Sequence, residues 1–174
     1  MASPVGHLAF GGAAAAVVAR ATGTPDSAAL WLGAALACGI PDVDVAFQLV
    51  GLDKHLHRSG THSLLFAAAV IAGTLALMGA LGVAPAPALA GAWIAALLSH
   101  YLLDVITTGP TLGRMGWGIP LLWPLCRKRF WVRHPFLVGD RTESQTYHDT
   151  LREMREDLVR LVPPCVVVML LARL

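Results

Sequence analysis

The feature that most constrains the fold is an apolar run from Ser63 to Val83, which contains no charged residue in 21 positions. As an α-helix rising 1.5 Å per residue, this run would be about 31 Å long, enough to cross the hydrocarbon core of a bilayer. Only 14% of the 174 residues are charged, whereas a water-soluble domain usually carries about 25%. The sequence therefore predicts an all-α integral membrane protein.

Four further apolar segments accompany this run. The five segments span residues 7–21, 28–50, 63–83, 87–107 and 158–174. We interpret the Ala-rich first segment as a retained helix, because residues 1–6 lack the Lys and Arg of a signal peptide. Glycine and alanine recur in the first four segments and favour close helix packing in lipid. We expect a compact bundle of about four to five transmembrane helices.

A polar region separates the fourth and fifth segments. Its first part combines tryptophans with Arg127-Lys128-Arg129, a composition typical of a segment in the membrane interface. Its second part, about residues 143–160, spaces charges as a helix does (Arg152 with Glu156, Glu153 with Asp157) and predicts an exposed amphipathic helix. We therefore expect a transmembrane core at 1–120, a basic interfacial and cytoplasmic segment at 121–157 and a C-terminal membrane helix at 158–174.

The distribution of Lys and Arg predicts the orientation of the bundle. Basic residues are concentrated between the second and third segments and after the fourth, whereas the opposite connections carry only Arg20. By the positive-inside rule the basic side faces the cytoplasm, so we expect a multi-pass protein of the inner (plasma) membrane. A net charge of +2 without a basic–aromatic array argues against a nucleic-acid partner. The three cysteines lie far apart and form no CxxC pair, so neither disulfides nor a thiolate metal site is expected.

Ionisable residues gather on this predicted cytoplasmic side. Four crossings would bring seven of them to one depth: His7, Asp42, Asp44, His57, His62, His100 and Asp104. Because side chains at i and i+4 share a helix face, His100 and Asp104 should project together. Asp42 and Asp44 follow Pro41, where a broken helix end can direct both carboxylates to a common point. The pattern predicts one polar site built from several helices.

Such a site needs a compensating positive charge. Neighbouring carboxylates at membrane depth repel one another unless a cation neutralises them, and imidazole with carboxylate suits a divalent metal, Zn or Mn, as one ion or two. Two other interpretations stay open: His100 and Asp104 as a buried hydrogen-bonded pair, and Arg58 as either a substrate-binding or a lipid-anchoring residue. We interpret Thr61 and Ser63 as N-cap residues of the following helix rather than as nucleophiles.

The order of these residues resembles a known family. His7, Pro41-Asp42-Val43-Asp44, the string HRSGTHS at 57–63 and Ser99-His100-Tyr101-Leu102-Leu103-Asp104 are similar to motifs of the YdjM-like inner-membrane proteins, which include LexA-regulated members. That family is described as membrane-bound, metal-dependent hydrolases. The resemblance covers about residues 1–120. It implies that Asp42, Asp44, His57, His62, His100 and Asp104 are metal ligands or their neighbours, joined by His7.

These observations predict a metal-dependent hydrolase that cleaves a lipid or lipid-linked phosphoester by metal-activated water at the cytoplasmic leaflet. Asp44, His62 and Arg58 are the expected catalytic residues, with Arg58 steadying the phosphate. One alternative is a structural or regulatory membrane protein whose metal fixes the bundle. Another is a metal or proton transporter, although transport sites usually lie near the bilayer midplane between repeated halves, and no internal repeat is visible in the sequence.

Overall fold

A computed structural model of the chain describes residues 2–44, 60–108, 118–134 and 147–174. Within these ranges the protein is all-helical, apart from one isolated β-bridge between Ile119 and Phe130. The elements are α1 (Pro4–Thr22), α2 (Ala28–Gly39), η1 (Ile40–Asp42), η3 (Gly60–His62), α4 (Leu64–Ala80), α5 (Pro87–Thr107), α6 (Tyr147–Arg160) and α7 (Val162–Leu171). The prediction of an all-α chain is confirmed.

Serine side chains cap α1, α2 and α4. Ser3, Ser27 and Ser63 each accept a hydrogen bond from a backbone N–H in the first turn of α1, α2 and α4, which satisfies a donor that the helix leaves free. Gly23 ends α1 with a φ of 67°, a left-handed conformation that glycine adopts without strain. The predicted N-cap role of Ser63 is thus confirmed.

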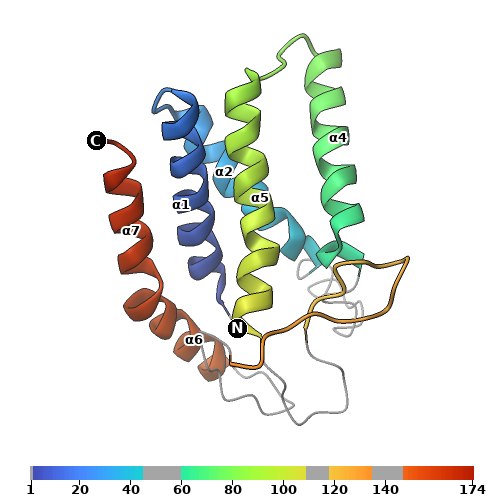
Figure 1. The fold of residues 1–174 in the computed structure, drawn as a ribbon, viewed down its shortest axis with the longest axis vertical. Coiled ribbons are helices and arrows are strands. Elements are labelled where there is room, and N and C mark those ends of the chain that lie inside the picture. Colours follow the sequence, from blue (N-terminus) through green and yellow to red (C-terminus); the bar gives the residue numbers. More distant parts are fainter. Residues whose placement is uncertain (1, 45–59, 109–117, 135–146) are drawn as a thin grey trace.

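The core of the bundle forms where α1, α2 and α5 meet. Figure 1 shows α5 between α1 and α4, with α7 on the far side of α1. Small residues allow the close approach: a Cβ on Gly11 would lie 2.7 Å from the Cβ of Cys38, and a Cβ on Gly33 would overlap the indole of Trp93. The core cluster is accordingly rich in alanine, and its fully buried members include Ala15, Ala92 and Ala96.

Among the residues that the structure describes, two helices, α1 and α5, are long and apolar enough to cross a membrane, fewer than the four to five expected. The other apolar helices are shorter: α2 together with η1, α4 and α7. In α4 the helix ends at Ala80, because Leu81 and Gly82 turn the chain and Gly82 has a φ of 69°. Its 17 residues correspond to about 26 Å, less than the expected 31 Å.

The predicted amphipathic helix exists as α6, and Arg152 pairs with Glu156 at 3.4 Å as its spacing indicates. The expectation that Asp157 is exposed on the same helix is wrong. Asp157 is fully buried, and its Oδ2 accepts the backbone N–H of Ser3 at 2.5 Å. The carboxylate thereby lies at the N-terminus of α1, where negative charge is favourable. A Cβ on Gly6 would lie 2.5 Å from that same oxygen, so the contact requires a glycine there.

Residues 118–134 form an irregular segment beside η3. Ile119 and Phe130 exchange two backbone hydrogen bonds, of 3.0 and 3.1 Å. Gly118 precedes them with a φ of 102°, and a side chain there would collide with the carbonyl oxygen of Phe130. The segment exposes Trp123 and Trp131 together with nearby basic residues.

Candidate metal site

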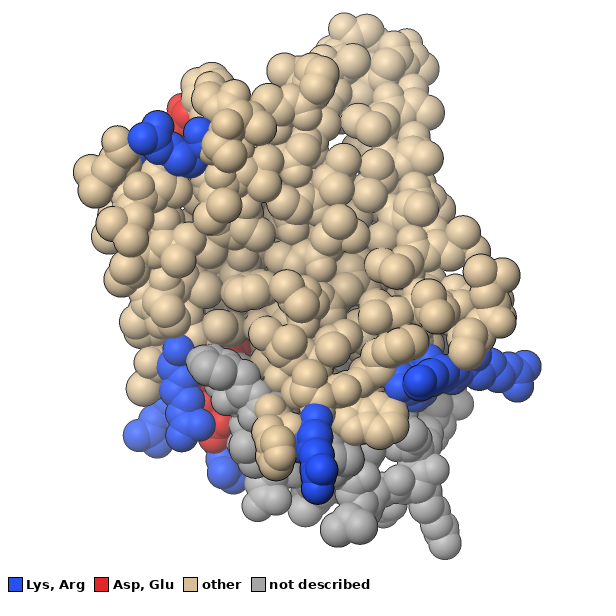
Figure 2. Space-filling view, in the orientation of Figure 1, with Lys and Arg blue, Asp and Glu red and all other residues tan. Residues whose placement is uncertain are grey.

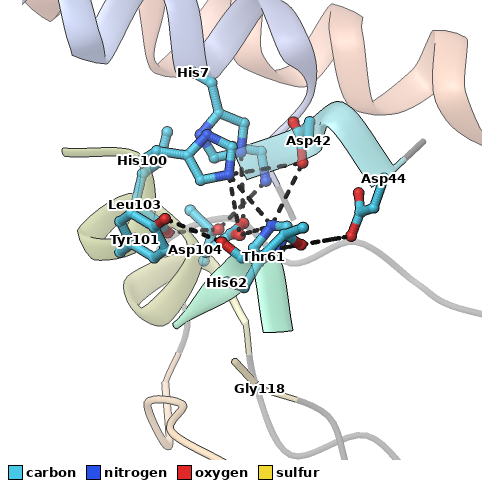
Figure 3. A network of polar contacts seen from close by, with 12 residues as sticks. His7, Asp42, Asp44, Thr61, His62, His100, Tyr101, Leu103, Asp104 and Gly118 are labelled. Carbon is cyan, nitrogen blue, oxygen red and sulfur yellow. Dashed lines mark hydrogen bonds and ion pairs between the residues drawn. The ribbon is translucent and has the colours of Figure 1, made fainter. Parts of the chain in front are cut away.

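Four elements each bring polar side chains to one place. His7 comes from the first turns of α1, Asp42 from η1 and His62 from η3, while His100 and Asp104 lie one turn apart on α5. Figure 3 shows these five side chains, which we call the five-residue cluster, converging on one point. His7, His62, His100 and Asp104 are at most 5% exposed, and the side chain of Asp42 is 28% exposed. The predicted convergence of these five residues is thus present in the structure.

Two carboxylates approach the same imidazole nitrogens. Asp104 Oδ2 lies 3.3 Å from His62 Nε2 and 3.6 Å from His100 Nε2, and Asp104 Oδ1 lies 3.5 Å from His7 Nε2. Asp42 Oδ1 lies 3.4 Å from His62 Nε2 and 3.6 Å from His100 Nε2. The 3.6 Å contact between His100 Nε2 and Asp104 Oδ2 confirms that these two residues share one face of α5. The arrangement directs three imidazoles and two carboxylates inward.

The hydrogen bond between His100 and the backbone determines which of its two ring nitrogens could bind a metal ion. His100 Nδ1 lies 2.7 Å from the carbonyl oxygen of Cys38, which can only accept a hydrogen bond. Nδ1 therefore carries hydrogen, and in the neutral ring Nε2 has a free lone pair. This Nε2 lies 3.4 Å from Nε2 of His62. Two N–H groups that faced each other at this distance would repel, so the two nitrogens cannot both carry hydrogen. At least one bare nitrogen therefore faces the centre.

Two overlapping groups of three side chains could hold a metal ion: His7 with Asp42 and His100, and His62 with His100 and Asp104. In each group one donor atom per residue lies within 4.8 Å of the others. The donors fit a divalent ion, because Zn and Mn both accept imidazole nitrogen and carboxylate oxygen. His7 Nδ1 is buried and finds no hydrogen-bond partner among the described residues, which further marks a site that is polar and incompletely satisfied.

Asp42 lies in η1, outside the two candidate spans. Its Oδ1 lies 3.4 Å from His62 Nε2 and 3.6 Å from His100 Nε2, and its side chain is the most exposed of the five. It supplies the negative charge that is closest to solvent in the five-residue cluster.

Asp44 does not belong to either of these groups. Its Oδ2 accepts the hydroxyl of Thr61 at 2.7 Å and lies 3.9 Å from His62 Nδ1, the nitrogen that faces away from the cluster centre. Asp42 and Asp44 thus approach the same imidazole from opposite sides instead of sharing one point, because Val43 continues the helical turn of η1 and separates the two side chains. The predicted residues His57 and Arg58 lie outside the described residues.

Two contributors were missed by the sequence reasoning. Thr61, interpreted as an N-cap, instead joins Asp44 to His62, with its Oγ1 3.1 Å from His62 Nδ1. The hydroxyl of Tyr101 donates to the carbonyl of Thr61 at 3.0 Å. Both residues stand directly beside a predicted ligand in the chain, His62 and His100 respectively. That adjacency is the only sequence signal that could have indicated them.

Comparison with known proteins supports the resemblance found in the motifs. A family model, described as YdjM inner membrane protein, matches residues 1–173. No curated protein and no solved structure matches the chain. The match extends past residue 120, where the motif resemblance ended, and includes α6 and α7. The chain therefore belongs to the YdjM inner membrane protein family.

Proposed function

We propose that this protein is a membrane-embedded, metal-dependent hydrolase that cleaves a lipid or lipid-linked phosphoester at the cytoplasmic leaflet. One observation supports this most directly: Nε2 of His62 and Nε2 of His100 face each other at 3.4 Å, with Asp42 and Asp104 beside both. Bare imidazole nitrogens and carboxylates in a buried place repel one another. A divalent cation bound among them would relieve that repulsion.

The proposed ligands are the members of the five-residue cluster. We infer one ion, Zn or Mn, rather than two. Both candidate groups require His100, whose Nδ1 is committed to the carbonyl of Cys38, so a single lone pair serves both. When bound, such an ion polarises a water molecule and neutralises charge that develops on a phosphoryl oxygen. The chain's own contribution is to hold five donors in place and to exclude bulk water from four of them.

The location of the cluster supports a substrate at the membrane surface. Figure 2 shows Lys and Arg gathered at the end of the bundle where α6 and residues 118–134 lie, below a broad band without charge. His7 and Asp104 lie towards this same end. In a multi-pass topology with four to five crossings, the positive-inside rule assigns this end to the cytoplasm. Basic residues at that depth would attract phosphate head groups.

Asp42 is the one member of the five-residue cluster that is not buried in the described part of the chain. Asp42, with 28% of its side chain exposed, is the ligand through which solvent and substrate reach the centre. His62 is the proposed catalytic residue that touches the reacting atoms, and Asp44 acts through it. Arg58, predicted to steady the phosphate, remains assigned by its motif alone.

The test combines metal analysis with hydrolysis by protein purified in detergent. His62→Ala and His100→Ala should both lose bound Zn or Mn by elemental analysis and lose turnover of lipid phosphoesters in mixed micelles. His134→Ala is the matched control, because His134 is exposed and distant from the cluster in the chain; it should keep both properties. Unchanged metal content in both cluster variants would contradict the proposal, as would a metal-loaded wild type that hydrolyses no phosphoester.

A second function is favoured by the depth of burial. Four of the five proposed ligands are at most 5% exposed, and structural metal sites are typically closed to solvent. The metal of a structural or regulatory membrane protein would raise its thermal stability without any chemistry. A chelator that lowers the melting temperature, combined with no hydrolysis by the metal-loaded protein, would favour this second function.

A further inference from the structure

We propose that Thr61 is a positioning residue for the metal site: its hydroxyl connects Asp44 to Nδ1 of His62 and fixes the tautomer that leaves Nε2 free for a cation. The inference rests on the proposed function, because a fixed tautomer matters only if Nε2 is a ligand. Thr61 belongs neither to the five-residue cluster nor to the residues that the motif resemblance implies as ligands. It would form a layer behind the ligands, as orienting groups in metal sites do.

The direction of the hydrogen bonds follows from counting protons. Thr61 Oγ1 lies 2.7 Å from Asp44 Oδ2 and 3.1 Å from His62 Nδ1. A hydroxyl has one hydrogen to donate, and an ionised carboxylate can only accept. The hydroxyl hydrogen therefore goes to Asp44, so the contact with His62 is made by the hydroxyl oxygen as acceptor. Nδ1 of His62 must then carry hydrogen, and in the neutral ring Nε2 is left bare.

The backbone around Thr61 is held so that the hydroxyl cannot move away. Tyr101, on α5, donates its hydroxyl to the Thr61 carbonyl at 3.0 Å. Ser63 Oγ donates to the carbonyl of Gly60 at 2.6 Å, and the backbone N–H of Ser63 donates to that same carbonyl at 3.2 Å. These bonds fix η3 on both sides of Thr61. Figure 3 shows Thr61 between Asp44 and His62, with Tyr101 close by.

His100 provides an internal comparison. Its Nδ1 is held by a backbone carbonyl, that of Cys38, which no side-chain substitution removes. His62 has the equivalent acceptor on a side chain, and Asp44 behind it is only 4% exposed. A hydrogen-bond acceptor at Nδ1 thus orients both proposed ligands: a backbone carbonyl for His100 and the Thr61 hydroxyl for His62. Thr61 is the member of this arrangement that mutation can test.

Three substitutions separate the hydroxyl from the shape of the side chain. Thr61→Val keeps the branched shape and removes the hydroxyl, whereas Thr61→Ser keeps the hydroxyl. Thr74→Val is the matched control, since Thr74 is exposed on α4. Loss of an orienting outer group typically weakens metal binding by roughly 10–100-fold. We expect that loss of Zn²⁺ affinity in Thr61→Val, near wild-type affinity in Thr61→Ser and no change in Thr74→Val.

The decisive measurement is the tautomer of His62 itself. In ¹⁵N-histidine-labelled protein without metal, at alkaline pH where imidazoles are neutral, NMR should report hydrogen on Nδ1 of His62 in the wild type and in Thr61→Ser. Thr61→Val should lose that preference while the His100 signals stay unchanged. Hydrogen on Nε2 of His62 in the wild type would overturn the inference, as would wild-type Zn²⁺ affinity in Thr61→Val.

The same experiment separates this inference from the proposed function. A wild type that binds no Zn²⁺ but shows hydrogen on Nδ1 of His62 would refute the metal site while leaving the hydrogen-bond relay intact. A wild type that binds Zn²⁺ and hydrolyses lipid phosphoesters, with Thr61→Val equal to it in affinity and spectrum, would refute the relay alone.

Discussion

Asp104 lies where imidazoles from three elements, α1, η3 and α5, meet. Its two oxygens lie 3.3–3.6 Å from nitrogens of His7, His62 and His100, and the residue is fully buried. A carboxylate at membrane depth is costly to bury unless positive charge lies beside it. Neutral imidazoles with bare nitrogens supply no such charge, so a divalent cation bound among them would be attracted strongly to Asp104.

The substitution Asp104→Asn should weaken metal binding strongly. The amide has nearly the same shape but no negative charge, so we expect Zn²⁺ affinity to fall by more than the roughly 10–100-fold typical of an orienting residue. Isothermal titration of the purified protein in detergent measures this affinity.

Asp26→Asn controls for the loss of a carboxylate as such. Asp26 is exposed and pairs with Arg173 at 2.9 Å, away from the cluster, and its replacement should leave Zn²⁺ affinity unchanged. Equal affinities in the wild type and Asp104→Asn would show that Asp104 is no ligand.

Residue types and spacing were enough to predict the five-residue cluster, because ionisable residues in apolar segments have few other roles. The tautomers and the relay through Thr61 were not predictable in this way. They depend on η1 and η3 meeting so that one hydroxyl lies between Asp44 and His62. A threonine just before a helix reads as an N-cap in any sequence. Only the positions of the neighbouring elements distinguish the two roles.

At the scale of elements, the contact between α2 and α5 depends on the absence of a side chain at Gly33. The indole of Trp93 lies against Gly33, and its Nε1–H donates to the carbonyl of Ala29 at 3.1 Å. By contrast, nothing lies within 4 Å of a Cβ added at Gly73 on α4. Packing therefore requires a glycine at position 33 but not at position 73.

Gly33→Ala should destabilise the protein, because the indole must move and lose its hydrogen bond with Ala29. Overpacking of this kind costs about 1–3 kcal/mol. Gly73→Ala, the matched control, should be neutral or stabilising by up to about 1 kcal/mol through helix propensity. Thermal unfolding of both variants in the same detergent compares them. Equal melting temperatures for the two would mean that α2 and α5 are not packed as described.

The elements themselves were predicted unevenly. The bounds of α5 match the expected 87–107, because Pro87 fits the first turn of a helix and the sequence has no further proline until Pro110. The 28–50 segment was predicted as one helix with an interruption, and the structure ends α2 at Gly39, before η1. The burial of Asp157 was not predictable, since its partner Ser3 is 154 residues away in the chain.

At the scale of the whole molecule, charge is divided between two ends. The described basic residues of 127–133 and α6 lie at one end, while Asp26 and Arg173 pair at the other. Figure 1 places the start of α1 near the first end and the C-terminus near the second. The positive-inside rule then predicts a cytoplasmic start of α1 and an external end of α7.

Cysteine accessibility can test this orientation without adding a fusion. Cys126 is partly exposed at the basic end, whereas Cys38 and Cys165 are buried. A membrane-impermeant maleimide should therefore label Cys126 in inside-out vesicles and not in right-side-out ones. Pro25→Cys in a Cys126→Ser background should show the reverse, since Pro25 lies in the exposed connection between α1 and α2. Labelling of Cys126 from the outside would invert the topology.

The contact between Asp157 and the start of α1 has a consequence for how the protein is made. Ser3 leaves the ribosome 154 residues before the carboxylate that receives its N–H. At about 5–20 residues per second, roughly 8–30 seconds pass before that partner exists. During this interval the first turn of α1, which carries His7, lacks its contact with Asp157. Maturation of the centre thus waits for the last helices to be translated, and a ribosome stalled before α6 would leave a nascent chain with His7 not yet anchored.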